Sequence, residues 1–415
     1  MNRQLAKAVV AAFREPEVEP DRCGFAHFDE PDWMSITEWL HTSGLALYFL
    51  ARAKALGIED AIPAKTLHCL EANYAENSVR TADLFSEFVK INMEFQRAKL
   101  TYANLKGFSL APSACADFAC RYQHDLDFLV ARRDAERCRQ AVERHGYRLA
   151  AKFGDTWEFR AGPAEPLSMR DLYKAKAQRS LEAHLVSEAE QNEMERSGNR
   201  LSRLQLQLWN GFEFPALSEC DKLASQALHL FKHFQTEWTR TAWMLEYATA
   251  IRSHEGDLSF WKNSVDAVVA SPESAIGIGL ATLITSRAFG VHPPDGFIAC
   301  TVDMMPRQVR LWANRYQNDV VYVERPGSKL YLLLKDSLLA DQPAWRLQKR
   351  KKLFPLRLPP RDSGELQHGG ILPRAKLLHA RLTFIWARLR FHVTAGFHYW
   401  IEAARWKRVV ADLRS

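Results

Sequence analysis

The stretch RYQHDLDFLV, residues 121–130, places two aspartates in a run of apolar residues. The apolar run predicts a buried β-strand, in which residues two apart point to the same side. Asp125 and Asp127 then stand together on one face, and two carboxylates so close repel each other unless a cation lies between them. The alternative, an exposed polar face or a turn, leaves the surrounding Leu, Phe and Val residues unexplained. The pattern therefore predicts a metal site.

The segments around this strand predict a small α/β unit. Between residues 101 and 190 the chain consists of short stretches rich in β-formers and one helix-like stretch, RDAERCRQAVERHG, which ends at Gly146. Short strands that alternate with a helix over this length are typical of a small mixed sheet.

Helical patterns flank the unit on both sides. Residues 33–98 have apolar side chains at helical spacing, with Ser35 as the expected N-cap and Gly57 as the expected stop. Farther on, LSECDKLASQALHLFKHFQTEWTRTAWMLEYATAIRS predicts two helices. The stretch VVYVERPGSKLYLLLKD fits a hairpin across Pro326 and Gly327, although a helix after Gly327 fits equally well.

These patterns predict an α+β fold, in which a small mixed β-sheet is flanked by N- and C-terminal helical regions. With 415 residues, the chain is long enough for two or three domains. The predicted parts are an N-terminal helical region (1–98), an α/β core (99–200), a helical C-terminal domain with the hairpin or helix described above (201–344), and a basic linker with an amphipathic helical tail (345–415).

The composition is that of a folded protein from a reducing compartment. Aromatic residues make up 11% of the chain, which excludes disorder over most of its length. The seven cysteines are scattered and form no C-x-x-C pair, so a disulfide scaffold or a zinc knuckle is disfavoured. The N-terminus has too short an apolar run for a signal peptide, and the longest apolar stretch, Ala275–Ile284, is too short to span a bilayer. We expect a cytoplasmic protein.

The positive charge is concentrated in the C-terminal tail. Residues 345–415 carry 16 Lys and Arg against 4 Asp and Glu, a net charge of +12, so the first 344 residues carry −5 of the chain's +7. Within the tail, PRAKLLHARLTFIWARLRFHV predicts a basic amphipathic helix with Trp386 and Phe391. Such a helix fits peripheral contact with the inner face of a membrane, or docking on its own domain. Nucleic acid is a disfavoured partner, because the body is acidic and shows no nucleic-acid motif.

Several short motifs follow one another in a characteristic order. Leu105-Lys106-Gly107 is followed by Arg121, by the Asp125–Val130 stretch, and by a helix that ends at Gly146-Tyr147. The next strand, LEAHL, carries an acid two residues before a His. This order resembles the nucleotidyltransferase superfamily with the DNA polymerase β-like palm. Within it, the pattern is most similar to an uncharacterised bacterial nucleotidyltransferase family.

The resemblance implies a magnesium-dependent enzyme that moves a nucleotidyl group from a nucleoside triphosphate to a hydroxyl acceptor, with a suggested role in extracellular polysaccharide biosynthesis. Such transfer uses two Mg²⁺ ions held by carboxylates, which clamp the attacking and leaving oxygens. The expected catalytic residues and metal ligands are Asp125, Asp127 and Glu182. The expected nucleotide-binding residues are Lys106, Gly107, Arg121 and His124.

Two features depart from the superfamily pattern and keep alternatives open. The usual Gly-Ser pair is replaced by Lys106-Gly107-Phe108, and the gap from Gly107 to Asp125 is longer than usual. One alternative is a non-catalytic, nucleotidyltransferase-like binding or scaffold protein at the membrane surface. Another is an enzyme that adds nucleotides to RNA. The choice of Glu182 as third acid competes with four later glutamates, Glu188, Glu190, Glu193 and Glu195.

Two further groups of polar residues occur in the helical stretch after residue 216. His229 and His233 are four residues apart and share a helix face, where packing or hydrogen bonding is favoured over a metal role. Glu246 lies among large apolar residues and is expected to form a buried ion pair, with Arg240 as the candidate partner.

Overall fold

The structure is a computed structural model. It describes residues 1–14, 24–163, 171–186, 200–324, 326–339, 342–354 and 371–412, with residues 371–380 and 412 described by their backbone alone. The chain forms two compact units. The first consists of Met1–Leu230 and Arg240–Met304, and the second of Phe231–Thr239 and Met305–Ser415.

A seven-stranded mixed sheet lies in the first unit, in the order β3-β4-β5-β2-β1-β7-β6. The strands are β1 (Tyr102–Leu105), β2 (Asp125–Val130), β3 (Arg148–Phe153), β4 (Thr156–Ala161), β5 (Arg179–Leu185), β6 (Gln205–Trp209) and β7 (Phe212–Ala216). The pairs β2–β5 and β1–β7 are parallel, and the other neighbours are antiparallel. The predicted α+β class with a mixed sheet is confirmed.

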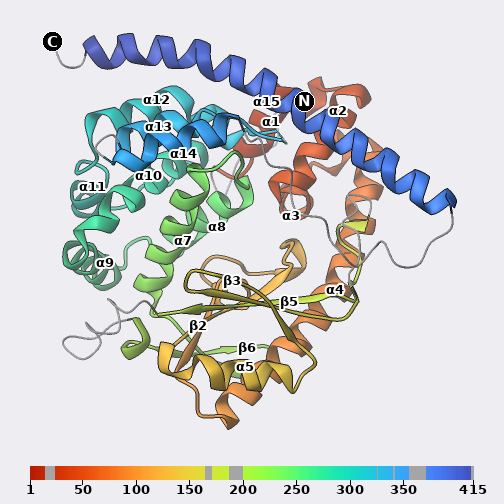
Figure 1. The fold of residues 1–415 in the computed structure, drawn as a ribbon, viewed down its shortest axis with the longest axis vertical. Helices are drawn as coiled ribbons and strands as arrows, with labels where there is room; N and C mark the ends of the chain where they lie inside the picture. The colour runs from red at the N-terminus through yellow and green to blue at the C-terminus, as the bar shows by residue number, and fades with distance from the viewer. Residues whose placement is uncertain are drawn as a thin grey trace. The chain divides into compact units, whose positions relative to one another are not determined.

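Helices form most of the remaining described residues. Those that begin in the first unit are α1 (Arg3–Ala11), α2 (Glu30–Ser43), α3 (Ala46–Leu56), α4 (Ala64–Arg97), α5 (Ala135–Glu143), α7 (Glu219–Phe234), α8 (Thr241–Ser253), α9 (Leu258–Ala270), α10 (Pro272–Phe289) and α11 (Asp295–Thr301). Those of the second unit are α12 (Arg307–Val321), α13 (Tyr331–Leu338), α14 (Pro343–Leu353) and α15 (Ile371–Asp412). Figure 1 shows α5 on one side of the sheet and α7 and α8 on the other.

The first long helical stretch is divided by its capping residues. The side chain of Asp29 accepts a hydrogen bond from the backbone of Asp32 in a capping box, so Asp29 is the N-cap of α2. The predicted N-cap, Ser35, is wrong and lies inside the helix. Gly44 adopts a left-handed conformation and ends α2, and Gly57 ends α3 in the same way. The predicted stop at Gly57 is confirmed.

The helix α4 packs along the face of the sheet that carries the apolar residues of β2. Phe95 of α4 and Phe128 of β2 are fully buried, with ring centroids 5.0 Å apart. Two buried amides fix the same packing, because Asn104 of β1 donates a 2.8 Å hydrogen bond to Asn92 of α4. Since buried amides cost free energy unless they are paired, this bond fixes where β1 lies against α4.

The sheet extends farther along the chain than the predicted core. The strands β6 and β7 form a hairpin across Asn210 and Gly211, both at positive φ, and β7 pairs with β1. An Asn-Gly pair between alternating apolar residues is the characteristic signal of such a hairpin. Of the two alternatives for the stretch around Pro326 and Gly327, the helix is confirmed and the hairpin is wrong, because residues 331–338 form α13.

The basic linker is in part a helix. Residues 343–353, which include the KRKK run, form α14, because this stretch has no internal Pro or Gly to interrupt it. The rest of the predicted linker, residues 355–370, lies outside the described residues. The predicted tail helix is present as α15.

Candidate active site

The two aspartates of β2 lie on the face of the sheet opposite to α4. Phe128 points toward Phe95 of α4, so the residues next to it in the strand point to the other side. Asp127 is buried, with a side chain that is 5% exposed, and Asp125 is half-buried. Packing of β2 against α4 therefore fixes which face of the strand is apolar. Strand alternation then places both carboxylates on the opposite face.

Parallel pairing with β5 brings a third acid to this pair. Asp127 lies opposite Glu182 in the register of β2 and β5, and Leu129 lies opposite His184. The neighbours Leu181 and Ala183 are fully buried on the other face, so Glu182 and His184 share the face of the aspartates. Glu188, Glu190, Glu193 and Glu195, the competing acids, lie outside the described residues.

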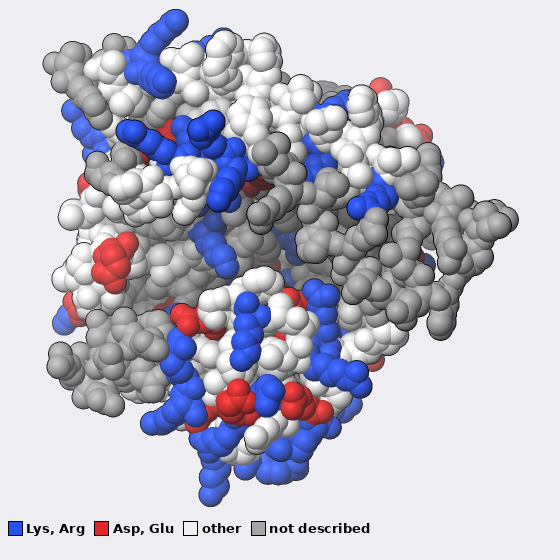
Figure 2. All heavy atoms as spheres, viewed as in Figure 1, with Lys and Arg blue, Asp and Glu red and all other residues white. Residues whose placement is uncertain are grey.

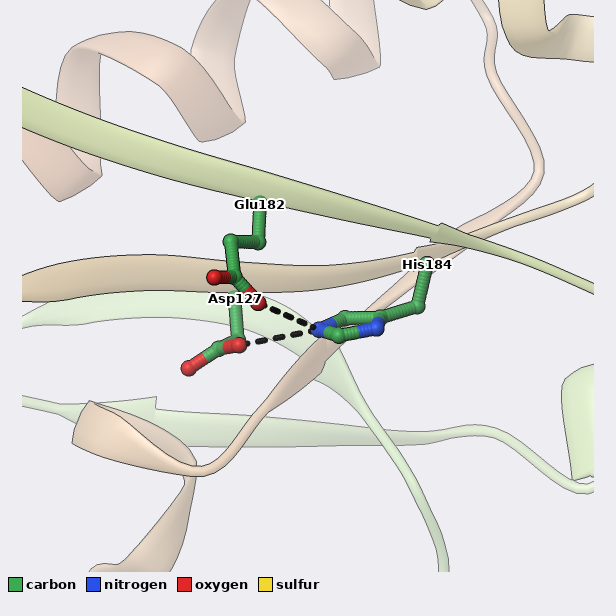
Figure 3. Close-up of side chains that lie close together, drawn as sticks. All are labelled: Asp127, Glu182 and His184. Carbon is green, nitrogen blue, oxygen red and sulfur yellow. Dashed lines mark hydrogen bonds and ion pairs between the residues drawn. The ribbon is translucent and has the colours of Figure 1, made fainter. Parts of the chain in front are cut away.

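The imidazole of His184 joins two of the carboxylates. Its Nε2 lies 2.9 Å from Asp127 Oδ1 and 3.3 Å from Glu182 Oε2 (Figure 3). Its Nδ1 lies 3.1 Å from the hydroxyl of Thr156 in β4, which fixes the orientation of the ring. His184 was part of the sequence resemblance, but we had given it no role in the site.

Lys106 reaches the same carboxylate from the end of β1. Its Nζ lies 3.0 Å from Asp127 Oδ1. The backbone there is unusual, since Lys106 and Gly107 both have positive φ, at 49° and 45°. A Cβ at Gly107 would lie 2.5 Å from Nε2 of Gln123, so that side chain would have to move, and the positive φ itself favours glycine.

The charges of these groups shift one another's pKa values. Burial raises the pKa of Asp125, and the charge of Asp127 adds to this effect, to about 6. Burial alone would also raise the pKa of Asp127. The charges and hydrogen bonds of Lys106 and His184 outweigh this effect and hold the pKa of Asp127 well below its usual range. Burial lowers the pKa of Lys106 and of His184, but the nearby carboxylates outweigh burial and raise both values. The site therefore favours an ionised Asp127 surrounded by positive charge.

The donor atoms fit a divalent cation. Asp127, Glu182 and His184 each offer one ligand atom, and these atoms lie within 4.8 Å of one another. The carboxylates are the oxygen ligands that Mg²⁺ prefers, whereas an imidazole nitrogen is a ligand that transition metals accept more readily. The structure thus brings Asp127 and Glu182 together as predicted, adds His184, and places Asp125 beside this group on the same face.

Two residues of β4 extend the site, and sequence reasoning missed them. Glu158 lies opposite Glu182 in the β4–β5 register, so Asp127, Glu182 and Glu158 form one row across three strands. The carboxylate of Glu158 accepts a 2.7 Å hydrogen bond from Arg160. Arg160 lies opposite Ser180, the β5 partner of Asp125. Strand register alone brings these residues to the site, and a single sequence does not reveal register.

Arg121 is bound inside the first unit. Its Nε donates a 2.9 Å hydrogen bond to Glu246 of α8, and its guanidinium also bonds the side chain of Gln123. The hydroxyl of Tyr48 donates to the same Glu246 carboxylate at 3.0 Å. Glu246 is therefore buried and ion-paired as expected, and Arg121 is its partner. Whether Arg121 also contacts a phosphate stays a prediction.

A cationic cluster surrounds His124. The ring of Tyr122 lies between Arg80 and Arg240, whose guanidinium carbons are 4.5 and 5.0 Å from its centroid. His124 is exposed and stacks on Tyr122, with ring centroids 6.5 Å apart. Partial desolvation of the ring by its neighbours, followed by the charges of Arg80 and Arg240, lowers the pKa of His124. No sequence signal marks Arg80, which lies in α4, or Arg240, which directly precedes α8, because both are 40 residues or more from the β2 motif.

The paired histidines are not members of the cluster of Asp127, Glu182 and His184. His229 packs edge-on against Trp243, with ring centroids 4.7 Å apart, which fits the packing role that we favoured. Over the described ranges, Asp127, Glu182 and His184 are the one set of three or more His, Cys, Asp and Glu residues close enough to hold an ion.

The fold and the carboxylate-bearing strand pair define an α+β protein with a candidate metal site. A model of the family described as uncharacterised nucleotidyltransferase matches residues 29–290, and the chain belongs to this family. Among solved structures, an antigenic nucleotidyltransferase-like protein from Paracoccidioides brasiliensis is 12% identical, with a TM-score of 0.30, over 54% of this chain and 95% of that chain. No curated protein matches the chain.

Proposed function

We propose that this protein is a metal-dependent nucleotidyltransferase, which moves a nucleotidyl group from a nucleoside triphosphate to a hydroxyl acceptor and releases pyrophosphate. The observation that carries the proposal is the register of β2 and β5, which sets Glu182 opposite Asp127 within ion-sharing distance. Membership of the nucleotidyltransferase family supports it.

In this proposal Asp125, Asp127 and Glu182 would hold two Mg²⁺ ions, which supply charge stabilisation to the attacking and leaving oxygens. Asp127 is the most buried of the three acids and would serve both ion positions. Glu182 is 32% exposed, so it is the acid best placed to meet an incoming hydroxyl. His184 holds Asp127 and Glu182 in position, and its nitrogen would make Mn²⁺ an acceptable substitute for Mg²⁺.

The proposed triphosphate site combines predicted and newly found residues. Lys106 follows β1 at the carboxylates, and Gly107 comes directly after it with a positive φ, a conformation that glycine adopts easily. His124 stands exposed beside the guanidinium groups of Arg80 and Arg240. The guanidinium of Arg80 is buried and already donates to the backbone carbonyls of Leu172 and Gln123. The members of this cluster that support binding of a polyphosphate are therefore His124 and the half-buried Arg240, because a guanidinium group matches phosphate oxygens with paired hydrogen bonds.

One observation favours the non-catalytic alternative. The amino group of Lys106 already neutralises Asp127, in the position where a cation would bind. A binding protein derived from an enzyme would keep such a contact permanently, whereas an enzyme would exchange it for metal and substrate. The acceptor, and the suggested part in polysaccharide biosynthesis, stay predictions from the family resemblance.

The proposal is tested by transfer of label from each α-³²P-labelled nucleoside triphosphate to components of a cell extract, with Mg²⁺ or Mn²⁺. The full chain should transfer label from at least one nucleotide. The variant Asp125→Asn with Asp127→Asn should lose transfer by about 100-fold or more, because metal contacts contribute several kcal/mol to such transition states.

A matched control removes an acid outside the site. Glu143→Gln changes an exposed residue of α5 and should transfer label as the wild type does. If the double aspartate variant transferred as much label as the wild type, the proposal would be contradicted. Nucleotide binding by calorimetry without any transfer would instead favour the binding protein.

A further inference from the structure

The helix α15 turns one apolar face toward its own unit. Tyr399 and Trp406 are buried, and Trp406 packs near Tyr316 of α12, with ring centroids 6.0 Å apart. On the same face, Glu402 accepts hydrogen bonds from Arg315 and from the hydroxyl of Tyr316, at 3.2 and 3.1 Å. These contacts within the second unit fix which side of α15 is covered.

A second apolar face of α15 is open to solvent. Six large apolar side chains recur at steps of three or four residues, so they form one line along the helix, which we name the outer stripe. Their exposed fractions run from 54% to 71%. The outer stripe consists of Leu382, Trp386, Leu389, Val393, Phe397 and Trp400. Single exposed apolar residues are ordinary, but a continuous row with two Trp residues marks an interaction surface.

The charge around the outer stripe is positive. Arg390 is exposed next to Leu389, and the exposed pair Lys407 and Arg408 follows Trp400 by two helical turns. The one acid between residues 381 and 411 is Glu402, which is buried on the covered face and paired with Arg315 and Arg405. Figure 2 shows further Lys and Arg side chains gathered over α12 to α14 of the same unit.

Charge decides between two occupants of this surface. A second copy of the chain would bring another tail of net charge +12 against the first, and the two would repel each other. A bilayer with anionic headgroups attracts the same charge, and Trp residues are favoured where headgroups meet acyl chains. We propose that the outer stripe binds the surface of an anionic bilayer, with α15 lying in the plane of the interface. The contact is independent of any catalysis by the first unit.

Among the described helices, none is long and apolar enough to cross a membrane. The outer stripe also lies outside the residues that match the family model, so it belongs to the part of this chain that the family does not define.

Flotation with lipid vesicles tests the proposal on the full chain. The protein should float with vesicles that contain about 30% phosphatidylglycerol, should float weakly with pure phosphatidylcholine vesicles, and should dissociate as salt is raised. The variant Trp386→Ser with Trp400→Ser should bind anionic vesicles about tenfold more weakly or worse, because two interfacial anchors are lost.

The matched control is Phe384→Ser, which removes an apolar residue that is 52% exposed but lies off the outer stripe. It should bind as the wild type does, and circular dichroism should show equal helix content in all variants. Absence of vesicle binding by the wild type, or equal binding by the double Trp variant, overturns the proposal. A concentration-dependent dimer that the double Trp variant abolishes also overturns it, since the stripe would then join two copies.

Discussion

Lys106 adopts a backbone conformation that a lysine rarely takes, and its side chain ends on the most buried acid of the site. With φ at 49° and ψ at −153°, the residue lies outside the regions that L-residues favour. Such conformations cost about 1–3 kcal/mol and occur where the surrounding structure requires them. At Lys106, the ion pair with Asp127 accounts for the unusual backbone conformation.

Removing the amino group should expose Asp127 to metal. In Lys106→Met, the affinity of the site for Mn²⁺ should rise about tenfold, because a charge-assisted hydrogen bond no longer competes for the carboxylate. Calorimetric titration with Mn²⁺ measures this change. Lys90→Met, which alters an exposed lysine of α4, is the control. Unchanged affinity in Lys106→Met would show that the lysine does not compete with the ion.

The ion pair of Arg121 and Glu246 should matter chiefly for stability. In Arg121→Met, the Glu246 carboxylate is left buried without a cation, so the free energy of unfolding of the first unit should fall by about 3–5 kcal/mol. Urea denaturation measures the loss. Lys54→Met breaks a well-exposed pair with Glu71 and should cost less than about 1 kcal/mol. A stable Arg121→Met protein with weakened triphosphate binding would instead support the predicted phosphate contact.

At the scale of elements, strand pairing assembles the site. The DLDFLV run predicted β2, and LEAHL predicted β5, because each has a clear local pattern. Their parallel adjacency was not predictable from those patterns, since α5, β3 and β4 lie between them in the chain. A register shift of one residue would move Glu182 to the opposite face, so register decides whether the site exists.

The β6–β7 hairpin should depend on a glycine conformation. Gly211 has φ of 75°, and nothing lies within 4 Å of a Cβ built there, so a substitution costs conformational energy and not space. Gly211→Val should lower stability by about 1–2 kcal/mol, whereas Gly211→Asn should be nearly neutral because Asn tolerates the left-handed region. Thermal melting distinguishes the two. Equal losses in both variants would contradict the turn conformation.

At the scale of the whole molecule, the two units have different relations to the family. The family model ends at residue 290, inside the first unit, and leaves α12 to α15 outside. The chain's net positive charge comes from this outer part, because residues 345–415 carry +12 and the first 344 residues carry −5. The candidate catalytic site belongs to the first unit and the outer stripe to the second.

Buried thiols should make the fold sensitive to alkali. Burial raises the pKa of Cys115 and of Cys138 to about 12, whereas an unfolded thiol ionises near 8.5. Their contribution to stability is therefore complete below about pH 8.5 and is lost as pH rises toward 12, because the unfolded chain releases its protons first. Denaturation between pH 8 and 11 should show this decline, with a smaller slope in Cys138→Ala.

Thiol labelling gives an independent check on the same burial. At pH 8, iodoacetamide should modify the exposed Cys69 quickly and should leave Cys115 and Cys138 unmodified until the protein unfolds. Rapid labelling of Cys115 or Cys138 in the native protein would contradict their burial.

The sequence by itself determined the elements with strong local signals: the β2 strand, the neighbouring short strands, the helix α5, which ends at Glu143 shortly before Gly146, and the amphipathic tail. It also indicated the family, because the order of the short motifs along the chain can be recognised in one sequence. Tertiary structure alone decided that His184 bridges Asp127 and Glu182, that Arg121 pairs with Glu246, and that Arg80 and Arg240 flank Tyr122. The physical reason is that periodicity and capping act between near neighbours, whereas register and ion pairing join residues that are dozens of positions apart.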